Sequence, residues 1–160
     1  MAVKAGVKPT LSSTQMTFKH KMSRIVIDVT NESGFDITNI VIKGAVGTGV
    51  LDPATGNFTA KADAEASDLI ANTATANKVY YALLVPQNGV KLMVTVTTAD
   101  GKKRTQTLGT ADFKSGENRR MECNVQPADI EVKFSGPITG WVDGDDLLPD
   151  GEGEVETPTV

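Results

Sequence analysis

The sequence is poor in the residues from which catalytic centres and disulfide frameworks are built. Among its 160 residues it has one cysteine, Cys123, one histidine, His20, and only 5% aromatic side chains. One cysteine excludes an intramolecular disulfide. One histidine excludes, within a single chain, a metal site built on histidines and a Ser–His–Asp triad. We therefore predict no enzyme and no cofactor, although a pair of carboxylates that only folding brings together stays open.

Long apolar runs and nucleotide-binding motifs are missing as well. No apolar run approaches the ~18 residues that a membrane-spanning helix needs. The first ten residues, MAVKAGVKPT, have no apolar signal core, no cleavage pattern and no cysteine that could carry a lipid, so we expect any export signal to lie outside this sequence. Gly44, Gly47 and Gly49 fit neither a dinucleotide fingerprint nor a P-loop. We interpret these glycines as bulges or a turn.

The net charge of -4 is unevenly distributed. Seven acidic residues and no basic one lie between Asp143 and Glu156, which leaves thirteen acids against sixteen Lys and Arg elsewhere. The remaining body carries about +3, with its bases scattered among acids, and this excludes the basic stripe of a nucleic-acid-binding protein. Because Asp143, Asp145 and Asp146 lack the EF-hand order of ligands, we interpret residues 143–160 as a disordered acidic tail and not a calcium site.

The strongest strand signal runs from Phe18 to Thr30, within a first strand that we expect to begin near Gln15. The residues expected to face inward occupy even positions before Ser23 and odd positions after Arg24. They are Phe18, His20, Met22, Ile25, Ile27 and Val29. Since side chains of a strand alternate with period two, the change predicts a β-bulge or a break between two strands.

Further strands are predicted wherever apolar residues alternate between turn signals. Lys78 to Pro86 is a near-continuous apolar run and predicts a central strand covered on both faces. Asp100 and Gly101 predict a type I′ hairpin turn. We interpret Ala60 to Asn77 as a long loop. The other predicted strands are Ile37 to Lys43, the hairpin around Leu51 to Phe58, Val90 to Thr98, Lys103 to Leu108, Arg119 to Gln126 and Asp129 to Phe134.

Two single residues complete the predicted core. Cys123 alternates with Met121 and Val125, so we expect a small buried side chain and not a reactive thiol. Trp141 closes the apolar pattern, and we expect its indole to seal one end of the core. The sequence thus predicts an all-β, antiparallel β-sandwich of about seven to nine strands with little or no helix. We divide it into a flexible leader (1–14), one β-sandwich domain (15–142) and the acidic tail (143–160).

Several motifs, in this order and spacing, resemble those of the fimbrillin-like proteins of the Bacteroidetes. They cover about Thr17 to Gly144 and are Phe18-Lys19-His20-Lys21-Met22-Ser23-Arg24-Ile25, Leu84-Val85-Pro86-Gln87, Thr98-Ala99-Asp100-Gly101-Lys102, Phe113-Lys114-Ser115-Gly116 and Ile138-Thr139-Gly140-Trp141. Phe18, His20, Met22, Ile25, Ile27, Pro86 and Trp141 are the core and motif residues that we single out. The resemblance implies a transthyretin-like or Ig-like Greek key, and the stretch resembles the C-terminal domain of a two-domain protein.

The same resemblance implies a non-catalytic protein of the cell surface, often lipid-anchored on the outer membrane through a part that precedes this chain. Its implied partners are other fimbrial subunits, joined by strand addition, or ligands on host or bacterial surfaces. Pro149 and Pro158 make the C-terminal end a poor donor strand, which favours a tip or accessory role in adhesion over a shaft subunit.

A second hypothesis, from another functional class, is a glycan-binding β-sandwich module. An aromatic platform for a sugar ring would come from Trp141 with either Tyr80 or Tyr81, because these two tyrosines point to opposite faces of one strand.

Overall fold

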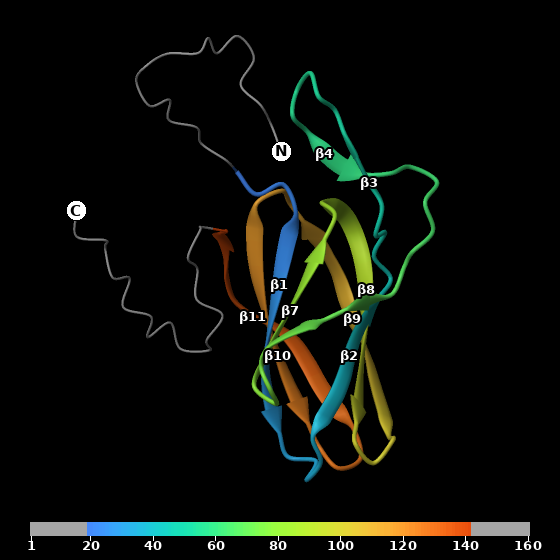
Figure 1. Cartoon of the computed structure of the whole chain (residues 1–160), viewed down its shortest axis with the longest axis vertical. Coiled ribbons are helices and arrows are strands. Elements are labelled where there is room, and N and C mark those ends of the chain that lie inside the picture. Colours follow the sequence, from blue (N-terminus) through green and yellow to red (C-terminus); the bar gives the residue numbers. More distant parts are fainter. Residues whose placement is uncertain (1–18, 142–160) are drawn as a thin grey trace, which may run out of the picture.

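The computed structural model describes residues 19–141, which form two β-sheets packed face to face and one projecting hairpin (Figure 1). The five-stranded sheet has the order β11-β10-β1-β7-β6, the four-stranded sheet has the order β5-β2-β8-β9, and β3 pairs with β4. The strands are β1 (Ser23–Asn31), β2 (Ile37–Lys43), β3 (Gly49–Leu51), β4 (Phe58–Ala60), β5 (Leu69–Ile70), β6 (Asn72–Thr75), β7 (Val79–Leu84), β8 (Gln87–Thr98), β9 (Lys103–Phe113), β10 (Glu117–Val125) and β11 (Ile130–Gly140).

The predicted all-β sandwich is confirmed, with no helix among residues 19–141. In this described range no helical segment is long and apolar enough to cross a membrane. Residues 19–141 form eleven strands, against the seven to nine that the sequence predicted, because β5 and β6, with two and four residues, were not predicted. Strands this short carry no readable alternation of apolar and polar residues.

β1 lies in the middle of the five-stranded sheet, parallel to β10 and antiparallel to β7. Its first five residues are all buried, so both faces of the strand are covered there. The chain before Ser23 is not a strand over residues 19–22, and β1 pairs with both neighbours without a register shift. The predicted strand around His20 is therefore wrong. The change of phase near Ser23 marks the beginning of β1.

The core lies between the two sheets, where alternate residues of each strand meet. Ile25, Ile27 and Met121 of the five-stranded sheet are fully buried, as are Ile40, Ile42, Leu92, Val94 and Val96 of the four-stranded sheet. Each buried side chain of this size contributes roughly 1.5–3 kcal/mol of transfer free energy. The alternation that the sequence shows in β2, β8 and β10 is thus the alternation of core and surface.

The segment that the sequence predicted as one loop, Ala60 to Asn77, contains two short edge strands. β5 pairs with β2 at the edge of the four-stranded sheet, and β6 pairs with β7 at the edge of the five-stranded sheet. Only Ala71, which is buried and donates its N–H to the Ile40 carbonyl at 2.9 Å, separates the two strands. The chain therefore crosses directly from one sheet to the other and closes this side of the sandwich. The prediction failed because two to four residues are too few to show an alternation of apolar and polar side chains, and because the partner of β5, β2, is distant in sequence.

The hairpin turn after β8 differs from its prediction in type. A type I′ turn needs a positive φ at both central residues, but Asp100 is not among the non-glycine residues of positive φ in the described part of the chain. Gly101 has a φ of 81°, and its N–H bonds the Thr98 carbonyl while the Thr98 N–H bonds the Lys102 carbonyl. This is a type I turn followed by a glycine bulge.

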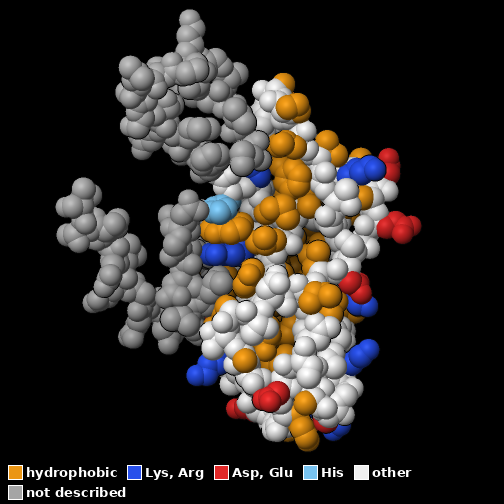
Figure 2. Space-filling view, viewed as in Figure 1, with side chains coloured by type: hydrophobic (Ala, Val, Ile, Leu, Met, Phe, Trp, Pro, Cys, Tyr) orange, Lys and Arg blue, Asp and Glu red, His pale blue; other side chains and the backbone are white. Residues whose placement is uncertain are grey.

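The hairpin of β3 and β4 projects from the upper end of the sandwich in Figure 1 and carries hydrophobic side chains on its surface in Figure 2. Val50 and Leu51 are exposed there. At its root a Cβ on Gly49 would collide with the Phe58 ring, which explains the glycine. Gly44, with a φ of 100°, has the Lys91 carbonyl where its Cβ would lie, so only glycine fits at this bend between β2 and β3.

Candidate functional site

A β-sandwich offers its four edge strands as sites for pairing with another chain. The edges are β5 and β9 of one sheet and β6 and β11 of the other. β5 has two residues and β6 has four. β11 has eleven but contains Pro137, which lacks an N–H donor, next to Gly136 with a φ of 67°. β9 also has eleven residues, without a proline, and is the long edge on which a further strand would pair.

β9 and β11 lie side by side on one lateral side of the sandwich, at the edges of opposite sheets. We call this the β9–β11 side, and the opposite one, where the chain crosses at Ala71, the β5–β6 side. Three side chains hold the β9–β11 side together, from Arg104 near one end through Gln106 to Arg119 near the other.

Gln106 of β9 bonds the backbone of β11 as another strand would. Its Nε2 donates to the Val132 carbonyl at 3.0 Å, and its Oε1 accepts from the Val132 N–H at 2.7 Å. A primary amide has the same donor and acceptor as a peptide group, so one side chain satisfies both backbone groups of Val132. Gln87 does the same for Val46 near the projecting hairpin, at 3.0 and 2.9 Å.

Arg119 of β10 reaches across between the sheets. Its guanidinium carbon lies 4.4 Å from the ring centroid of Phe134 on β11 and 5.3 Å from that of Phe113 on β9. Its Nη1 donates to the Asp112 carbonyl at 2.9 Å. Cation–π contacts of this kind contribute about 0.5–1 kcal/mol each at partly exposed sites. Arg119 thus fills the space between the sheets where β9 and β11 are no longer joined by Gln106.

Beyond Gln106 the two edges border a shallow groove. Its walls are Gly109 to Asp112 of β9 and, from β11, the half-buried Phe134 and the exposed Ile138. Lys114, Glu117 and Arg119 close its end. The groove combines a strand edge with an apolar wall, and these are the two features that docking of a peptide strand uses.

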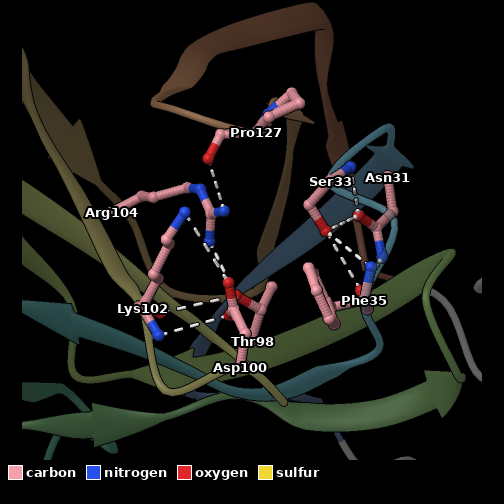
Figure 3. A network of polar contacts seen from close by, with 8 residues as sticks. All are labelled: Asn31, Ser33, Phe35, Thr98, Asp100, Lys102, Arg104 and Pro127. Atoms are coloured by element: carbon pink, nitrogen blue, oxygen red, sulfur yellow. Dashed lines mark hydrogen bonds and ion pairs between the residues drawn. The ribbon is translucent and has the colours of Figure 1, made fainter.

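At the third contact Arg104 is 4% exposed and joins two turns (Figure 3). Its Nη2 donates to the Pro127 carbonyl between β10 and β11 at 2.8 Å, and its Nη1 donates to the Thr98 hydroxyl at 2.7 Å. That hydroxyl donates in turn to Asp100 Oδ1 at 2.6 Å, and this bond is the main reason why the pKa of Asp100 is lowered. The Thr98 hydroxyl therefore links the Asp100 carboxylate to the buried Arg104 guanidinium through two consecutive hydrogen bonds.

The residues singled out from the sequence lie apart from this groove. Ile25 and Ile27 are in the core. Met22 and Pro86 are half-buried, and their carbonyls accept from Gly116 and Ala60. Phe18 lies outside the described residues.

His20 and Trp141 stack on each other, with ring centroids 3.8 Å apart and planes 3° apart, and the Arg24 guanidinium lies 4.8 Å from the Trp141 ring. Trp141 is half-buried and does not belong to the core cluster. The expectation that it seals the core is therefore wrong. Its indole packs on the residues that lead into β1, because β11 ends beside that entry. There the backbone N–H of Trp141 donates to the Gly116 carbonyl at 2.7 Å.

The other candidates from the sequence do not form a reactive or sugar-binding site. Burial raises the pKa of the Cys123 thiol to about 12, so the thiol stays protonated. Tyr80 is 3% exposed and belongs to the core, whereas Tyr81 is half-buried on the opposite face. Within residues 19–141 no group of His, Cys, Asp and Glu is arranged to hold a metal ion. The acidic cluster from Asp143 onward lies outside the described residues.

Comparison with known proteins identifies the family. The sequence profile of the fimbrillin-like family matches residues 1–141, and the chain therefore belongs to that family. No curated protein matches the chain in sequence.

Two solved structures share the fold. A protein from Bacteroides ovatus described as a cell adhesion protein is 19% identical, with a TM-score of 0.60 over 76% of this chain and 46% of its own length. A second, from Bacteroides uniformis and described in the same words, is 14% identical, with a TM-score of 0.63 over 78% of this chain and 52% of its own length. The chain thus spans about half the length of these solved relatives.

Proposed function

We propose that the protein is a non-catalytic structural or adhesive component of a bacterial fimbria, exported to the cell surface and associated with the outer membrane or the fimbria itself. Membership of the fimbrillin-like family supports the fimbrial role. The observation that carries the mechanism is the long, proline-free edge of β9 beside the groove that it shares with β11.

In the proposed assembly a strand from another fimbrial subunit pairs with β9 and lays alternate side chains against Phe134 and Ile138. Backbone hydrogen bonds supply affinity, and the apolar wall supplies register. A strand at β5 or β6 would gain little, because edges of two and four residues offer few backbone groups.

The test uses two exposed isoleucines on opposite sides of the sandwich. Ile138 is 50% exposed on β11 and Ile70 is 66% exposed on β5. Light scattering after size-exclusion chromatography, at increasing concentrations of the whole chain, reports self-association. We expect Ile138→Asp to abolish oligomers by placing a charge in the groove, and Ile70→Asp to leave them unchanged.

Hydrogen exchange read by mass spectrometry locates the contact. If the chain assembles through this side, amide exchange over residues 107–113 slows as the protein concentration rises. In Ile138→Asp the exchange of these residues does not change with concentration. A wild-type chain that stays monomeric at every concentration, or oligomers that only Ile70→Asp abolishes, would refute assembly of this chain through the β9–β11 side.

A further inference from the structure

A second depression lies at the lower end of Figure 1, where the β1–β2 loop meets the turn between β6 and β7. It is lined by Val29 to Asn31, Gly34 to Asp36, Asn77 and Lys78, and the only large apolar side chains among them are Phe35 and the half-buried Val29. Phe35 is 49% exposed, whereas the other large exposed hydrophobic side chains of the described part lie on β3, β5, β7 and β11. Phe35 is therefore an isolated aromatic ring set among polar groups.

The loop that carries Phe35 is fixed by its own hydrogen bonds. Asn31 Oδ1 accepts from the N–H and the hydroxyl of Ser33, at 3.1 and 2.7 Å, and Asn31 Nδ2 donates to the Phe35 carbonyl at 2.8 Å. The Ser33 hydroxyl accepts from the Phe35 N–H at 3.2 Å. In Figure 3 Asn31 and Ser33 hold the main chain of Phe35, and the ring takes no part in the hydrogen-bond network. A ring on so constrained a loop loses little conformational entropy when a ligand binds.

Asn77 fixes the depression from the other side. Its Oδ1 accepts from Asn31 Nδ2 at 3.2 Å and from the Ile37 N–H at 2.8 Å, while its Nδ2 donates to Asp36 Oδ1 at 2.9 Å. Asn77 has a φ of 60°, a conformation that non-glycine residues seldom adopt. The Asp36 carbonyl accepts from the Ala99 N–H at 2.8 Å, which ties the depression to the β8–β9 turn.

The depression keeps polar groups that can still form hydrogen bonds, and these include one negative and one positive charge. Asp36 Oδ2 receives no hydrogen bond from residues 19–141, and the exposed Lys78 has no ion pair with them. Asn77 Nδ2 has a second hydrogen to donate. One carboxylate and one ammonium balance in charge, so a charged ligand gains little here over a neutral one. Docking of an apolar peptide would require a wider apolar patch than the Phe35 ring and the half-buried Val29 provide.

We propose that this depression binds a neutral pyranose ring of a glycan. The C–H face of the sugar packs on the Phe35 ring, one hydroxyl donates to Asp36 Oδ2, and ring or hydroxyl oxygens accept from Lys78 Nζ and Asn77 Nδ2. A pyranose has one apolar face and hydroxyls around its rim, which matches one aromatic ring with polar groups around it. This inference is independent of assembly through the β9–β11 side.

The experiment titrates the ¹⁵N-labelled whole chain with methyl glycosides of glucose, galactose, mannose and N-acetylglucosamine, followed by amide NMR. We expect saturable shifts for residues 34–36 and 77–78 with at least one of these sugars. Phe35→Ala should weaken that binding about tenfold, equivalent to ~1.4 kcal/mol. Phe35→Trp should retain it. Leu51→Ala, which removes an exposed side chain on the distant projecting hairpin, should leave it unchanged.

The spectra of the variants also show whether each one is folded. Absence of saturable shifts at residues 34–36 and 77–78 with all four sugars refutes the proposal. So do shifts there that Phe35→Ala leaves intact. Binding of charged sugars such as glucuronic acid, but of none of the neutral glycosides, equally refutes it, because the two lining charges balance.

Discussion

The two lateral sides of the sandwich are closed by different means. On the β5–β6 side the chain itself crosses from one sheet to the other at Ala71. On the β9–β11 side two strands that are not consecutive face each other, and three side chains join them. A covalent crossing opens only when strands unpair, whereas contacts between side chains are broken and remade singly. This difference between the two sides supports the proposal that a partner strand enters on the β9–β11 side.

The largest effect is expected from Phe113, which is 1% exposed and packs 6.1 Å from Phe134, ring centroid to centroid. Phe113→Ala should lower the free energy of unfolding by about 3–5 kcal/mol, since it removes a buried ring and leaves a cavity. Leu69→Ala, at a half-buried position on the β5–β6 side, should cost less than ~2 kcal/mol. Urea unfolding measures both. Equal losses would contradict the view that the β9–β11 side depends on its side chains.

A smaller effect is expected from Gln106. Gln106→Ala leaves the N–H and the carbonyl of Val132 without this partner and should cost about 1–3 kcal/mol. Amide exchange should accelerate around residues 130–134 and stay unchanged in residues 69–75. The matched control is Gln87→Ala, which removes the same two-point contact from Val46 and should accelerate exchange near residue 46 instead. Faster exchange on both sides of the sandwich in Gln106→Ala would show that the two sides do not open separately.

The smallest effect is a dependence on pH at the Arg104 contact. The Thr98 hydroxyl lowers the pKa of Asp100 in the folded state. The folded state therefore binds the proton less readily than the unfolded chain. This stabilisation is complete above the ordinary aspartate pKa of about 3.9 and is lost as pH falls through the lower folded-state value. Urea midpoints of Asp100→Asn should consequently fall less steeply than wild type as the solution is acidified.

The control for this titration is Asp52→Asn in the projecting hairpin. The pKa of Asp52 is likewise lowered, chiefly by the Thr55 hydroxyl. Both variants should flatten the pH dependence of stability. Only Asp100→Asn should also accelerate amide exchange at the start of β9, because only its aspartate bonds the hydroxyl that holds Arg104. Identical exchange at residues 103–106 in the two variants would argue against a role of the Asp100–Thr98 hydrogen bond in holding Arg104.

Much of the fold could be read from the sequence. β2 has the predicted bounds, and the residues predicted to point inward in β10 are buried. β7 lies within the predicted run from Lys78 to Pro86, but the prediction that both its faces are covered is wrong, because Leu83 is exposed. β2 and β10 alternate apolar and polar residues and β7 is a continuous apolar run, so the information is local. β5 was missed because its two residues are too few to show an alternation, and β6 because its Asn, Thr and Ala residues carry no apolar pattern. Pairing with β2 and β7 decides that both are strands.

The candidate sites were harder to predict from the sequence than the fold. From their aromatic side chains, Trp141 and either Tyr80 or Tyr81 were predicted as a sugar platform. Tyr80 lies in the core and Trp141 stacks on His20. Phe35, the aromatic ring left exposed by a polar loop, directly follows Asn31-Glu32-Ser33-Gly34, residues that are typical of a turn. This turn signal was available in the sequence, but it does not show that the ring is exposed.

By itself the sequence determined an all-β chain with a single alternating core, because alternation and turn chemistry depend on neighbouring residues. Only the tertiary structure decided that Gln106 bonds a strand 26 residues away and that Asn31 meets Asn77 across 46 residues. A side-chain amide that pairs with a backbone looks in sequence like any other glutamine or asparagine. Its role depends on which distant peptide group folding leaves within hydrogen-bond distance.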